Sequence, residues 1–283
     1  MQQADCAPGL NRGEYLLMNC DCHIHLYEDH YPLAASATFK PPVAPVSAYR
    51  EVQQALGLQR VILVQPTGYG FDNSCVMDGL AQLGADEARG IVVVKPEVTD
   101  TELRRLHDRG VRGVRFMMLA GAGGLLDWAA LDAFAPRLAA LGWCANLQLD
   151  GRDLPRYKAQ IDRLPCKLVI DHIGKFLEPV AVDHPAFLAL LEILARPQRW
   201  VKLSGAYETS KIGPPHFDDV SLLAKALAQA HPDRCLWASN WPHPNRNPLP
   251  SNSLMLSLLE EWAPDAAVRE KILVHNPARL YGF

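Results

Sequence analysis

The sequence lacks the features that mark membrane proteins and nucleic-acid-binding proteins. No apolar run reaches the roughly 18 residues that a membrane-spanning helix needs, and the N-terminal MQQADCAPGLNRGEY has no apolar segment of the secretory type. Lys and Arg number 28 against 31 Asp and Glu, so no basic excess points to nucleic acid. We therefore expect no membrane segment and no nucleic-acid partner.

Cysteine is present without the spacing of a redox or metal motif. None of the seven cysteines forms a CxxC pair, and most lie within apolar runs, where buried free thiols are usual. An odd number of cysteines placed in this way favours a reducing compartment. We therefore expect a cytoplasmic protein.

The chain also lacks a linker, a low-complexity block and a Gly-rich phosphate turn after its first predicted strand. It has instead an alternation of short β-rich segments and amphipathic segments. Eight strands are predicted at Leu17–Asp21, Arg60–Gln65, Ile91–Lys95, Val111–Phe116, Trp143–Leu149, Lys167–Asp171, Trp200–Leu203 and Arg234–Ala238. Helices are predicted between them, including Val46–Leu56, Thr101–Arg109, Ala129–Leu141, Asp153–Leu164, Pro185–Leu194 and Asp219–Ala230.

This pattern predicts the fold class. Nearly all-apolar strands such as VILV and IVVV suit a parallel sheet covered on both faces. Eight βα repeats in 283 residues fit a (β/α)₈ TIM barrel better than an open doubly wound sheet, which would need a Gly-rich turn. We predict an α/β protein in which residues 17–283 form one barrel domain after an extension at residues 1–16. The open sheet is the alternative.

Two segments outside this pattern have predicted places. The Pro-rich stretch 31–45 is expected to form a long loop after the first strand. One interpretation has this loop covering the site, and the other has it as a solvated surface loop. The last four residues, 280–283, are expected to pack on the outside of the barrel.

Polar side chains gather where the predicted strands end, which is where the active sites of such barrels lie. His23 and His25 follow the first strand, and the period-two alternation of an extended chain puts both imidazoles on one side. Two imidazoles there can hold a metal or a developing oxyanion. His172, at the end of the sixth strand, can join them around one ligand atom.

Other strand ends carry side chains with two interpretations. Arg115 suits bidentate binding of a substrate carboxylate, and a structural salt bridge to an acid at the rim is the alternative. Asp171 is equally well an orienting carboxylate or a core hydrogen-bond acceptor. Lys202 belongs either to the barrel interior or to the site, and Tyr207 can offer a hydroxyl group to a substrate.

Several of these residues belong to an ordered set of motifs. The motifs are DCHIH at 21–25, VQP at 64–66 with DN at 72–73, GVR at 113–115, IDHIG at 170–174, KLSG at 202–205 and WASNWPH at 237–243. The set resembles the amidohydrolase superfamily, in the branch that contains 2-pyrone-4,6-dicarboxylate lactonases and sugar-acid lactonases. The resemblance implies a (β/α)₈ barrel that acts without a metal or other cofactor.

The eighth-strand motif departs from the hydrolases of this branch. They carry Asp at the position of Asn240, where the carboxylate activates water, and losing such a base costs about 10²- to 10⁴-fold in rate. The sequence is most similar to the D-galactarolactone isomerase subgroup, through Asn240, Tyr31-Pro32, DHIGKF at 171–176 and GAYETS at 205–210. That subgroup is understood to convert the 1,5-lactone of galactarate into the 1,4-lactone without using water.

The resemblance and the strand ends together give the expected site for a small sugar-acid lactone. His23, His25 and His172 surround the lactone carbonyl, Asn240 orients a hydroxyl group, and His243 or His172 carries the proton. The expected catalytic residues are His23, His25, His172, Asn240 and His243, and the expected substrate contacts are Arg115, Gln148, Lys175, Tyr207 and Asn73. No metal ligands are expected.

Three other functions compete with this one. A lactone hydrolase of an aldarolactone or of 2-pyrone-4,6-dicarboxylate, using a base other than Asn240, is the nearest. A non-catalytic barrel that only binds a ligand is the second, although it has no need of three imidazoles at one carbonyl. Metal-dependent amide hydrolysis is the last.

Overall fold

The computed structural model describes residues 18–283, and its centre is a sheet of eight parallel strands in the order β1 to β8. Each strand pairs with the next along the chain, which is the order of a (β/α)₈ barrel. The strands are β1 (Cys20–Ile24), β2 (Arg60–Val64), β3 (Ala88–Val92), β4 (Val111–Met117), β5 (Cys144–Gln148), β6 (Lys167–Ile170), β7 (Arg199–Leu203) and β8 (Cys235–Trp237).

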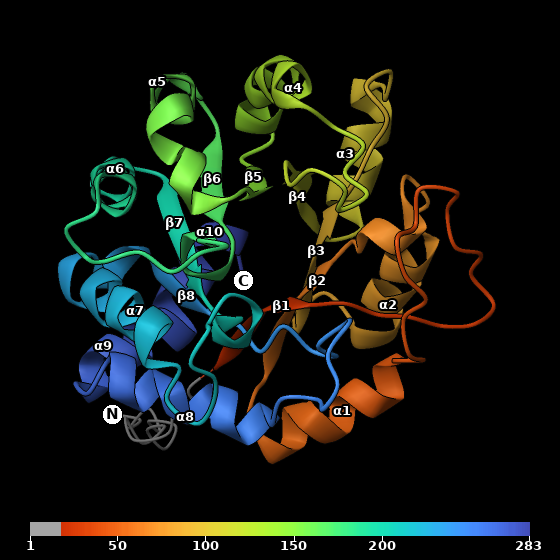
Figure 1. The fold of residues 1–283 in the computed structure, drawn as a ribbon. Coiled ribbons are helices and arrows are strands. Elements are labelled where there is room, and N and C mark those ends of the chain that lie inside the picture. Colours follow the sequence, from red (N-terminus) through yellow and green to blue (C-terminus); the bar gives the residue numbers. More distant parts are fainter. Residues whose placement is uncertain (1–17) are drawn as a thin grey trace, which may run out of the picture.

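Helices surround this sheet on the outside, so the predicted TIM barrel is confirmed (Figure 1). They are α1 (Val46–Ala55), α2 (Ser74–Leu83), α3 (Asp100–Asp108), α4 (Trp128–Ala140), α5 (Leu154–Arg163), α6 (Pro185–Leu194), α7 (Asp218–Ala230), α8 (Asn252–Trp262), α9 (Ala266–Glu270) and α10 (Asn276–Tyr281). The extension predicted at residues 1–16 lies outside the described residues. Among the helices of residues 18–283, none has the length and apolar character needed to cross a membrane.

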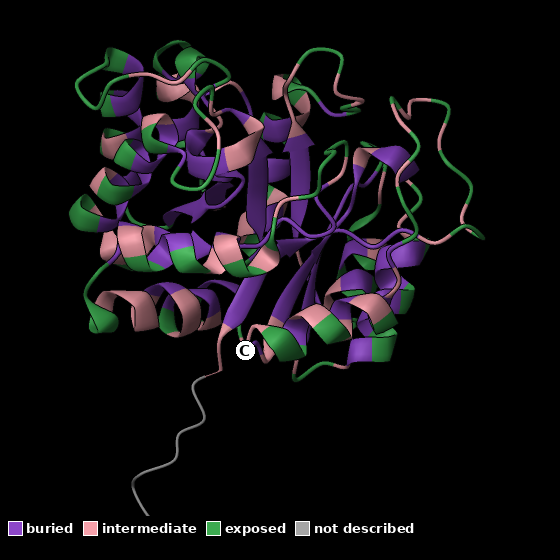
Figure 2. Cartoon of the chain, turned by 60° about the horizontal axis from the view of Figure 1, so that its bottom comes forward, coloured by how far each residue is buried: buried purple, intermediate pink, exposed green. Residues whose placement is uncertain are grey.

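Side chains alternate along each strand between the helices and the barrel interior. On β5, Ala145 and Leu147 pack in the cluster that includes the helices, whereas Cys144, Asn146 and Gln148 face inward. The strands are buried except for the half-buried Arg60, Arg112, Met117 and Lys167, and the helices expose their outer faces (Figure 2). Each inward position is therefore available either for packing or for chemistry.

The seam between β1 and β8 brings the first and last strands together. Asn240 N donates to His23 O at 3.0 Å, and His25 N donates to Trp241 O at 2.9 Å. The buried Asp21 carboxylate also accepts from Ser239, from the backbone N at 2.9 Å and from Oγ at 2.5 Å. These bonds fix the HxH motif directly beside Asn240.

Two predicted strands are shifted along the chain. The first was expected at Leu17–Asp21 but is observed at Cys20–Ile24, with a register shift between Asp21 and Ile24. The third was expected at Ile91–Lys95 but is observed at Ala88–Val92. The apolar run of the sequence continues past the end of β3 at Val92. The pairing stops there because Val93 N donates at 3.0 Å to Asn73 Oδ1 rather than to a neighbouring strand.

The prediction for the last four residues was wrong. Leu280 and Tyr281 are at most 2% exposed and pack against inward-facing residues, so they close the barrel interior from below instead of covering its outside. Lys167 Nζ donates to Leu280 O at 2.9 Å and holds this segment in place. The interior cluster comprises Cys20, Cys22, Ile62, Val64, Ile91, Cys144, Val169, Trp200, Leu236, Ala238, Leu280 and Tyr281.

The cysteines that the structure describes are all buried and unpaired, as the sequence predicted. Burial raises the pKa of the Cys144 thiol to about 12, which keeps it protonated and unreactive. Cys6 lies outside the described residues.

Candidate active site

A pocket of about 260 Å³ opens at the C-terminal ends of the strands. Six residues predicted from the sequence line it: His25, Arg115, Gln148, His172, Lys175 and Asn240. Thr38 and Phe39 of the loop after β1 line it as well, which favours the interpretation of this loop as a cover for the site.

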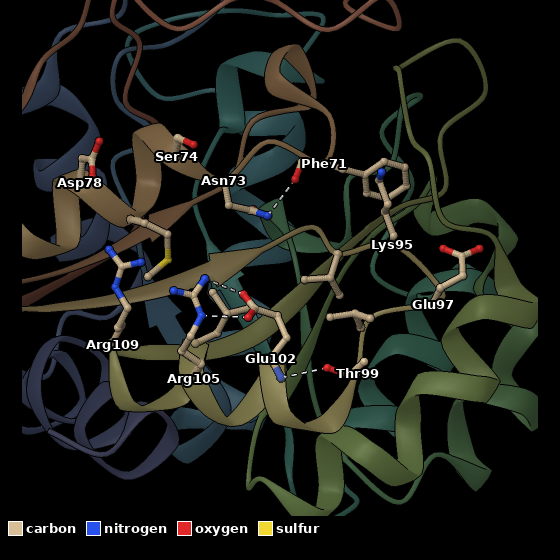
Figure 3. Close-up of a pocket in the computed structure, with 14 residues that line it drawn as sticks. Phe71, Asn73, Ser74, Asp78, Lys95, Glu97, Thr99, Glu102, Arg105 and Arg109 are labelled. Carbon is tan, nitrogen blue, oxygen red and sulfur yellow. Dashed lines mark hydrogen bonds and ion pairs between the residues drawn. The ribbon is translucent and has the colours of Figure 1, made fainter.

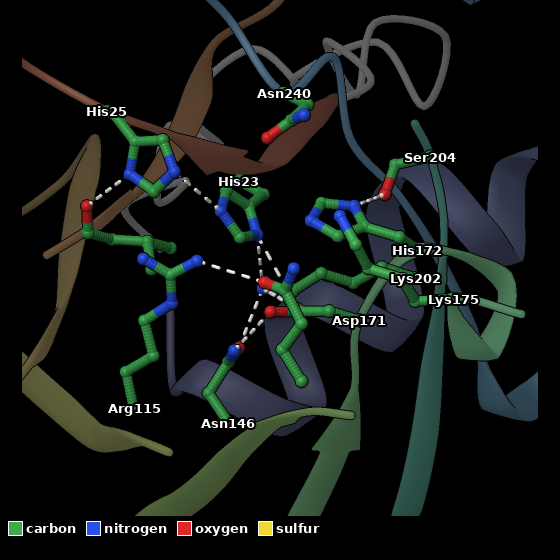
Figure 4. Close-up of polar contacts among 12 residues, drawn as sticks. His23, His25, Arg115, Asn146, Asp171, His172, Lys175, Lys202, Ser204 and Asn240 are labelled. Carbon is green, nitrogen blue, oxygen red and sulfur yellow. Dashed lines mark hydrogen bonds and ion pairs between the residues drawn. The ribbon is translucent and has the colours of Figure 1, made fainter. Parts of the chain in front are cut away.

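His23 and His25 form a directed pair beneath this pocket (Figure 4). Their Nε2 atoms are 3.2 Å apart, and His25 Nδ1 lies 2.7 Å from the carbonyl oxygen of Val64. Because a carbonyl only accepts, His25 carries its proton on Nδ1 and leaves Nε2 as an acceptor. His23 Nε2 therefore carries a hydrogen and donates it to His25 Nε2.

Lys202 sets the other end of His23. Its fully buried ammonium lies 3.0 Å from His23 Nδ1, 2.7 Å from Asn146 Oδ1 and 3.0 Å from Asp171 Oδ1. An ammonium only donates, so His23 Nδ1 accepts and its proton is on Nε2. Asn146 Nδ2 donates in turn to Asp171 Oδ2 at 2.8 Å, so the buried ion pair sits in a closed network.

Burial sets the charge of the three histidines. It is the main cause that holds the pKa of His23 and of His172 well below the usual range, and with Arg115 it lowers the pKa of His25 to about 3. Burial alone would raise the pKa of Asp171, but Lys202 and His23 outweigh it and hold that pKa well below its usual value. The site thus has three neutral imidazoles around one buried ion pair.

His172 is held by the segments after β6 and β7. Its backbone has φ 53°, and its Nδ1 lies 2.9 Å from Ser204 Oγ, which leaves Nε2 for other partners. Gly205, with φ 62°, is required beside it, because a Cβ there would lie 3.1 Å from His172 Nδ1. The ring centroid of His172 is 4.9 Å from that of His23.

Arg115 faces the pocket, as the alternation of β4 predicts, while Val114 and Phe116 face the helices. It donates at 2.8 Å to Gln65 O and at 3.0 Å to Gln148 Oε1. It forms no ion pair with any residue of 18–283, so the structural salt bridge considered from the sequence is not found.

The charge of the pocket is positive. Arg115, Lys175 and Arg246 line it, and Glu208 is the one carboxylate among its described lining residues. Glu208 forms an ion pair with Lys175. Burial, together with the neighbouring Arg115, lowers the pKa of Lys175 to about 8, and the Asp171 carboxylate acts in the opposite sense. Such a pocket favours an anionic ligand.

Asn240 lines the pocket, and its side-chain amide is held by Tyr207 and Glu208. Its backbone has φ 62°, which Asn tolerates better than most residues. Its Nδ2 donates at 2.8 Å to Tyr207 Oη and at 2.7 Å to Glu208 Oε1. Both amide hydrogens are used in this way, and Figure 4 shows the amide oxygen turned to the side of His23 and His25.

Tyr207 and His243 lie behind Asn240 and do not line the pocket. Tyr207 Oη is 2.9 Å from His243 Nδ1, and His243 Nε2 is 2.7 Å from Asn252 Oδ1. Both ring nitrogens of His243 are therefore occupied by protein groups. This placement suits orientation of Asn240 better than direct contact with a ligand.

Asn73 is a predicted substrate contact that the structure places in a different hollow, away from Asn240 and the pocket. Its side chain accepts from Val93 N and donates at 2.8 Å to Val93 O, so it completes the end of β3. It lines a larger hollow of about 620 Å³ between α2 and α3, on the outside of the barrel (Figure 3). That hollow contains the Glu102–Arg105 ion pair of α3 and no histidine.

The side chains of His23, Asp171 and His172 approach one another closely enough to be considered as metal ligands. They do not suit a divalent cation, because the ammonium of Lys202 already lies 3.0 Å from both His23 Nδ1 and Asp171 Oδ1. The inward ends of β5 and β8 offer the neutral amides of Gln148 and Asn240 rather than an imidazole and a carboxylate.

Sequence reasoning left Lys202 open, placed Asn146 at a strand end without giving it a role, and missed Glu208 and Arg246 as site residues. The inward alternation of β5 and β7 is a signal that finds Asn146 and Lys202. Glu208 meets Asn240 only through the tertiary packing of two loops 32 positions apart, for which the chain carries no local signal.

Comparison with known proteins places the chain in a family. A family model described as amidohydrolase matches residues 20–283. A 4-sulfomuconolactone hydrolase of Rhizobium radiobacter is 35% identical over 93% of this chain and 89% of its own length. A D-galactarolactone isomerase of Agrobacterium fabrum is 31% identical over 92% of this chain and 90% of its own length.

A solved structure shows the same fold. It is a probable 2-pyrone-4,6-dicarboxylic acid hydrolase of Acinetobacter baumannii with citric acid bound, 25% identical, with a TM-score of 0.84 over 94% of this chain and 100% of that chain. The parallel barrel, the HxH motif at the end of β1 and these matches agree, and the chain belongs to the amidohydrolase family.

Proposed function

We propose that this protein is a lactone isomerase that converts D-galactaro-1,5-lactone into the 1,4-lactone by intramolecular acyl transfer, without a divalent metal. The observation that carries the proposal is Asn240, a neutral amide at the position where a water-activating base is expected. Relatives named as lactone hydrolases and as a lactone isomerase support a lactone substrate, and the cationic pocket supports one with a carboxylate.

The reaction needs no water and no redox partner. The C4 hydroxyl oxygen attacks the C1 carbonyl, and a tetrahedral oxyanion forms. The bond between C1 and O5 then breaks, and the proton lost from O4 is delivered to O5. Atoms balance within one molecule, so the protein has to supply oxyanion stabilisation, orientation and one proton carrier.

The proposal divides these tasks among the residues of the pocket and the histidine pair beside it. In this proposal the His23 Nε2–H, which donates to His25 Nε2 in this structure, turns to the developing oxyanion when the substrate binds. A donor of this kind contributes about 10²- to 10³-fold. Arg115 and Lys175 hold the distal carboxylate and so determine which hydroxyl group reaches C1. Asn240 Oδ1 accepts a hydrogen bond from a substrate hydroxyl group.

His172 is the proton carrier in this proposal. With Nδ1 donating to Ser204 Oγ, at 2.9 Å, its Nε2 is unprotonated and available to the pocket. It takes the proton from O4 and returns it to O5. His243, the other carrier considered from the sequence, is held behind Asn240 by Tyr207 and Asn252.

A hydrolase of an anionic lactone is the second candidate, favoured by the presence of the Glu208 carboxylate in the pocket. Its two oxygens are, however, engaged by Asn240 and Lys175. A carboxylate neutralised in this way is a weaker base toward water than a free one.

The proposal is tested with freshly generated D-galactaro-1,5-lactone and chelator-treated enzyme in ¹⁸O-labelled water. Time-resolved proton NMR follows the lactones, and mass spectrometry of the product measures ¹⁸O incorporation. Growth of the 1,4-lactone faster than in buffer, without ¹⁸O incorporation, is the expected result. Direct appearance of labelled open galactarate would instead establish a hydrolase. Asn73→Ala is the matched control, because this Asn lies outside the pocket and its loss should leave the rate unchanged.

A further inference from the structure

Glu208 decides which way the Asn240 amide points. A carboxylate only accepts hydrogen bonds, so the group that lies 2.7 Å from Glu208 Oε1 has to be the amide nitrogen. Tyr207 cannot decide this, because its hydroxyl group both donates and accepts. Glu208 also forms an ion pair with Lys175, and its side chain is 14% exposed. The amide oxygen is thereby left for the pocket.

The hydrogen bonds behind Asn240, which link Asn252, His243 and Tyr207, favour the same orientation of the Asn240 amide. Asn252 Oδ1 accepts from His243 Nε2, which leaves His243 Nδ1 to accept from the Tyr207 hydroxyl group. The Tyr207 oxygen is then free to accept from Asn240 Nδ2 at 2.8 Å. In this arrangement every donor of the hydrogen-bond chain meets an acceptor, and it agrees with the orientation of the Asn240 amide that Glu208 sets.

We infer that Glu208 is a specificity-determining residue that forms an exclusive pair with position 240: only one of the two can carry a carboxylate, and which one does decides whether the acyl group goes to an internal hydroxyl group or to water. The inference rests on the proposed function. With the charge on Glu208, the pocket side of the pair is a neutral acceptor. With the charge on position 240, the pocket gains a base.

The sequence alone suggests that Asn240→Asp would add hydrolase activity, but the pair makes that single change insufficient. Two carboxylates with oxygens about 3 Å apart cannot both ionise, so they share a proton. Adding Glu208→Gln removes the conflict, because the new amide can donate to the new carboxylate. The double change keeps the charge of the pair and moves it from position 208 to position 240.

In that variant the hydrolytic step is balanced as follows. A water oxygen attacks C1 while its proton passes to the carboxylate at position 240. The bond between C1 and the ring oxygen then breaks, and the ring oxygen takes that proton. One water is consumed, and an open-chain hydroxy acid is released.

Other charged or titratable side chains face this pair, and any pH dependence has to be interpreted with them. The segment after β6 contributes Lys175 and His172, the segments after β7 and β8 contribute Tyr207, His243 and Arg246, and β1 contributes His23. The full set is Lys175, His172, Tyr207, His243, Arg246 and His23.

The test compares lactone hydrolysis, measured as open acid by proton NMR and as ¹⁸O incorporation, in wild type, Asn240→Asp, Glu208→Gln and the double variant. At pH 7 the double variant should hydrolyse at least about 10-fold faster than Asn240→Asp, since a working general base contributes about 10²-fold or more. Hydrolysis by Asn240→Asp should also rise at a higher pH than hydrolysis by the double variant. Glu208→Gln alone should gain no hydrolysis.

The matched control combines Asn240→Asp with Glu178→Gln, which removes a carboxylate that pairs with Lys211 on the surface. It should behave like Asn240→Asp. The inference is overturned if Asn240→Asp alone equals the double variant, or if the Glu178 control helps as much. Should the double variant fail to fold by circular dichroism, Asn240→Asp with Glu208→Ala takes its place under the same criteria.

The two proposals fail in different measurements. A wild-type protein that releases labelled open acid contradicts the isomerase function. The exclusive pair is judged by the ratio between Asn240→Asp and the double variant, whatever the wild type does. If the wild type hydrolyses and Glu208→Gln abolishes that activity, Glu208 is itself the base and the inference is overturned.

Discussion

The two halves of the barrel interior use the same backbone for opposite purposes. On β5 the inward residues are Cys144, Asn146 and Gln148 in order, so the strand passes from the interior cluster to the buried network and then to the pocket. On β7, Trp200 belongs to the interior cluster, and Lys202 two residues later carries the ion pair. On both strands, an inward-facing residue that packs in the interior cluster is followed, two positions later, by one that belongs to the buried polar network.

This difference shows where the molecule stores strain and charge. The lower half is apolar, and its inward side chains are held by close packing. The upper half contains a buried ion pair and the positive φ angles of His172, Lys175, Asn240 and His243. Residues in such conformations persist only where their surroundings hold them. The lower half therefore supplies the rigidity that the upper half requires.

Lys202→Met should have the largest effect on the upper half, because it removes one partner of the buried ion pair. The change leaves the Asp171 charge buried and unpaired, which costs about 3–5 kcal/mol of unfolding free energy. It also removes the donor that fixes the His23 proton on Nε2, so kcat should fall about 10²-fold or more. Urea unfolding and steady-state kinetics measure the two effects.

Lys202→Met with Asp171→Asn separates stability from activity. Neutralising both partners should recover most of the lost stability but none of the lost kcat. Recovery of both would mean that Lys202 acts only in stability.

Tyr281→Ala tests the lower half. This side chain is 1% exposed in the interior cluster, and removing a buried aromatic ring costs about 3–5 kcal/mol. The kcat at a temperature where the variant stays folded should change less than two-fold, roughly the level of a surface substitution. Tyr281→Phe is the matched control, because the buried hydroxyl group has no partner among the described residues and its loss should be nearly neutral.

A fall in pH should act on the buried histidines of the upper half. The folded protein holds His25 with a pKa of about 3, whereas the unfolded chain has the ordinary value near 6.5. The unfolded state therefore binds more protons between these values, and stability should decrease as pH falls below about 6.5. The expected loss is about 1.4 kcal/mol per pH unit for this residue.

Urea unfolding between pH 7 and pH 4.5 measures how steeply the unfolding free energy changes with pH. Tyr281→Phe should leave this slope unchanged, and His25→Gln should reduce it by the contribution of one bound proton, about 1.4 kcal/mol per pH unit. An unchanged slope in His25→Gln would show that this histidine is not held neutral by burial.

The sequence predicted the strands well because a parallel strand buried on both faces is a nearly continuous apolar run. The errors occurred where apolar character and pairing separate. Val93 continues the run of β3, but its backbone is bonded to Asn73. Leu280 and Tyr281 are apolar at the end of the chain, and nothing local distinguishes the outside of a barrel from its lower opening.

For the candidate site, sequence motifs identified six of the residues that line the pocket but not the contacts between them. The HxH motif and Arg115 stand at strand ends that the fold brings together. The direction of the hydrogen bonds from Lys202 through His23 to His25, and the contact of Glu208 with Asn240, depend on distances between separate loops and strands. These distances are properties of the folded chain alone.

The seam between β1 and β8 also bears on how this protein becomes active while it folds. Ser239 and Asp21 are 218 positions apart, so their pairing closes one of the longest loops in the described chain. Loop closure over such a separation is entropically unfavourable, and contacts of this kind slow folding. The same closure joins His23 to Asn240. An intermediate with most of its helices formed but the seam still open would therefore lack the catalytic arrangement entirely.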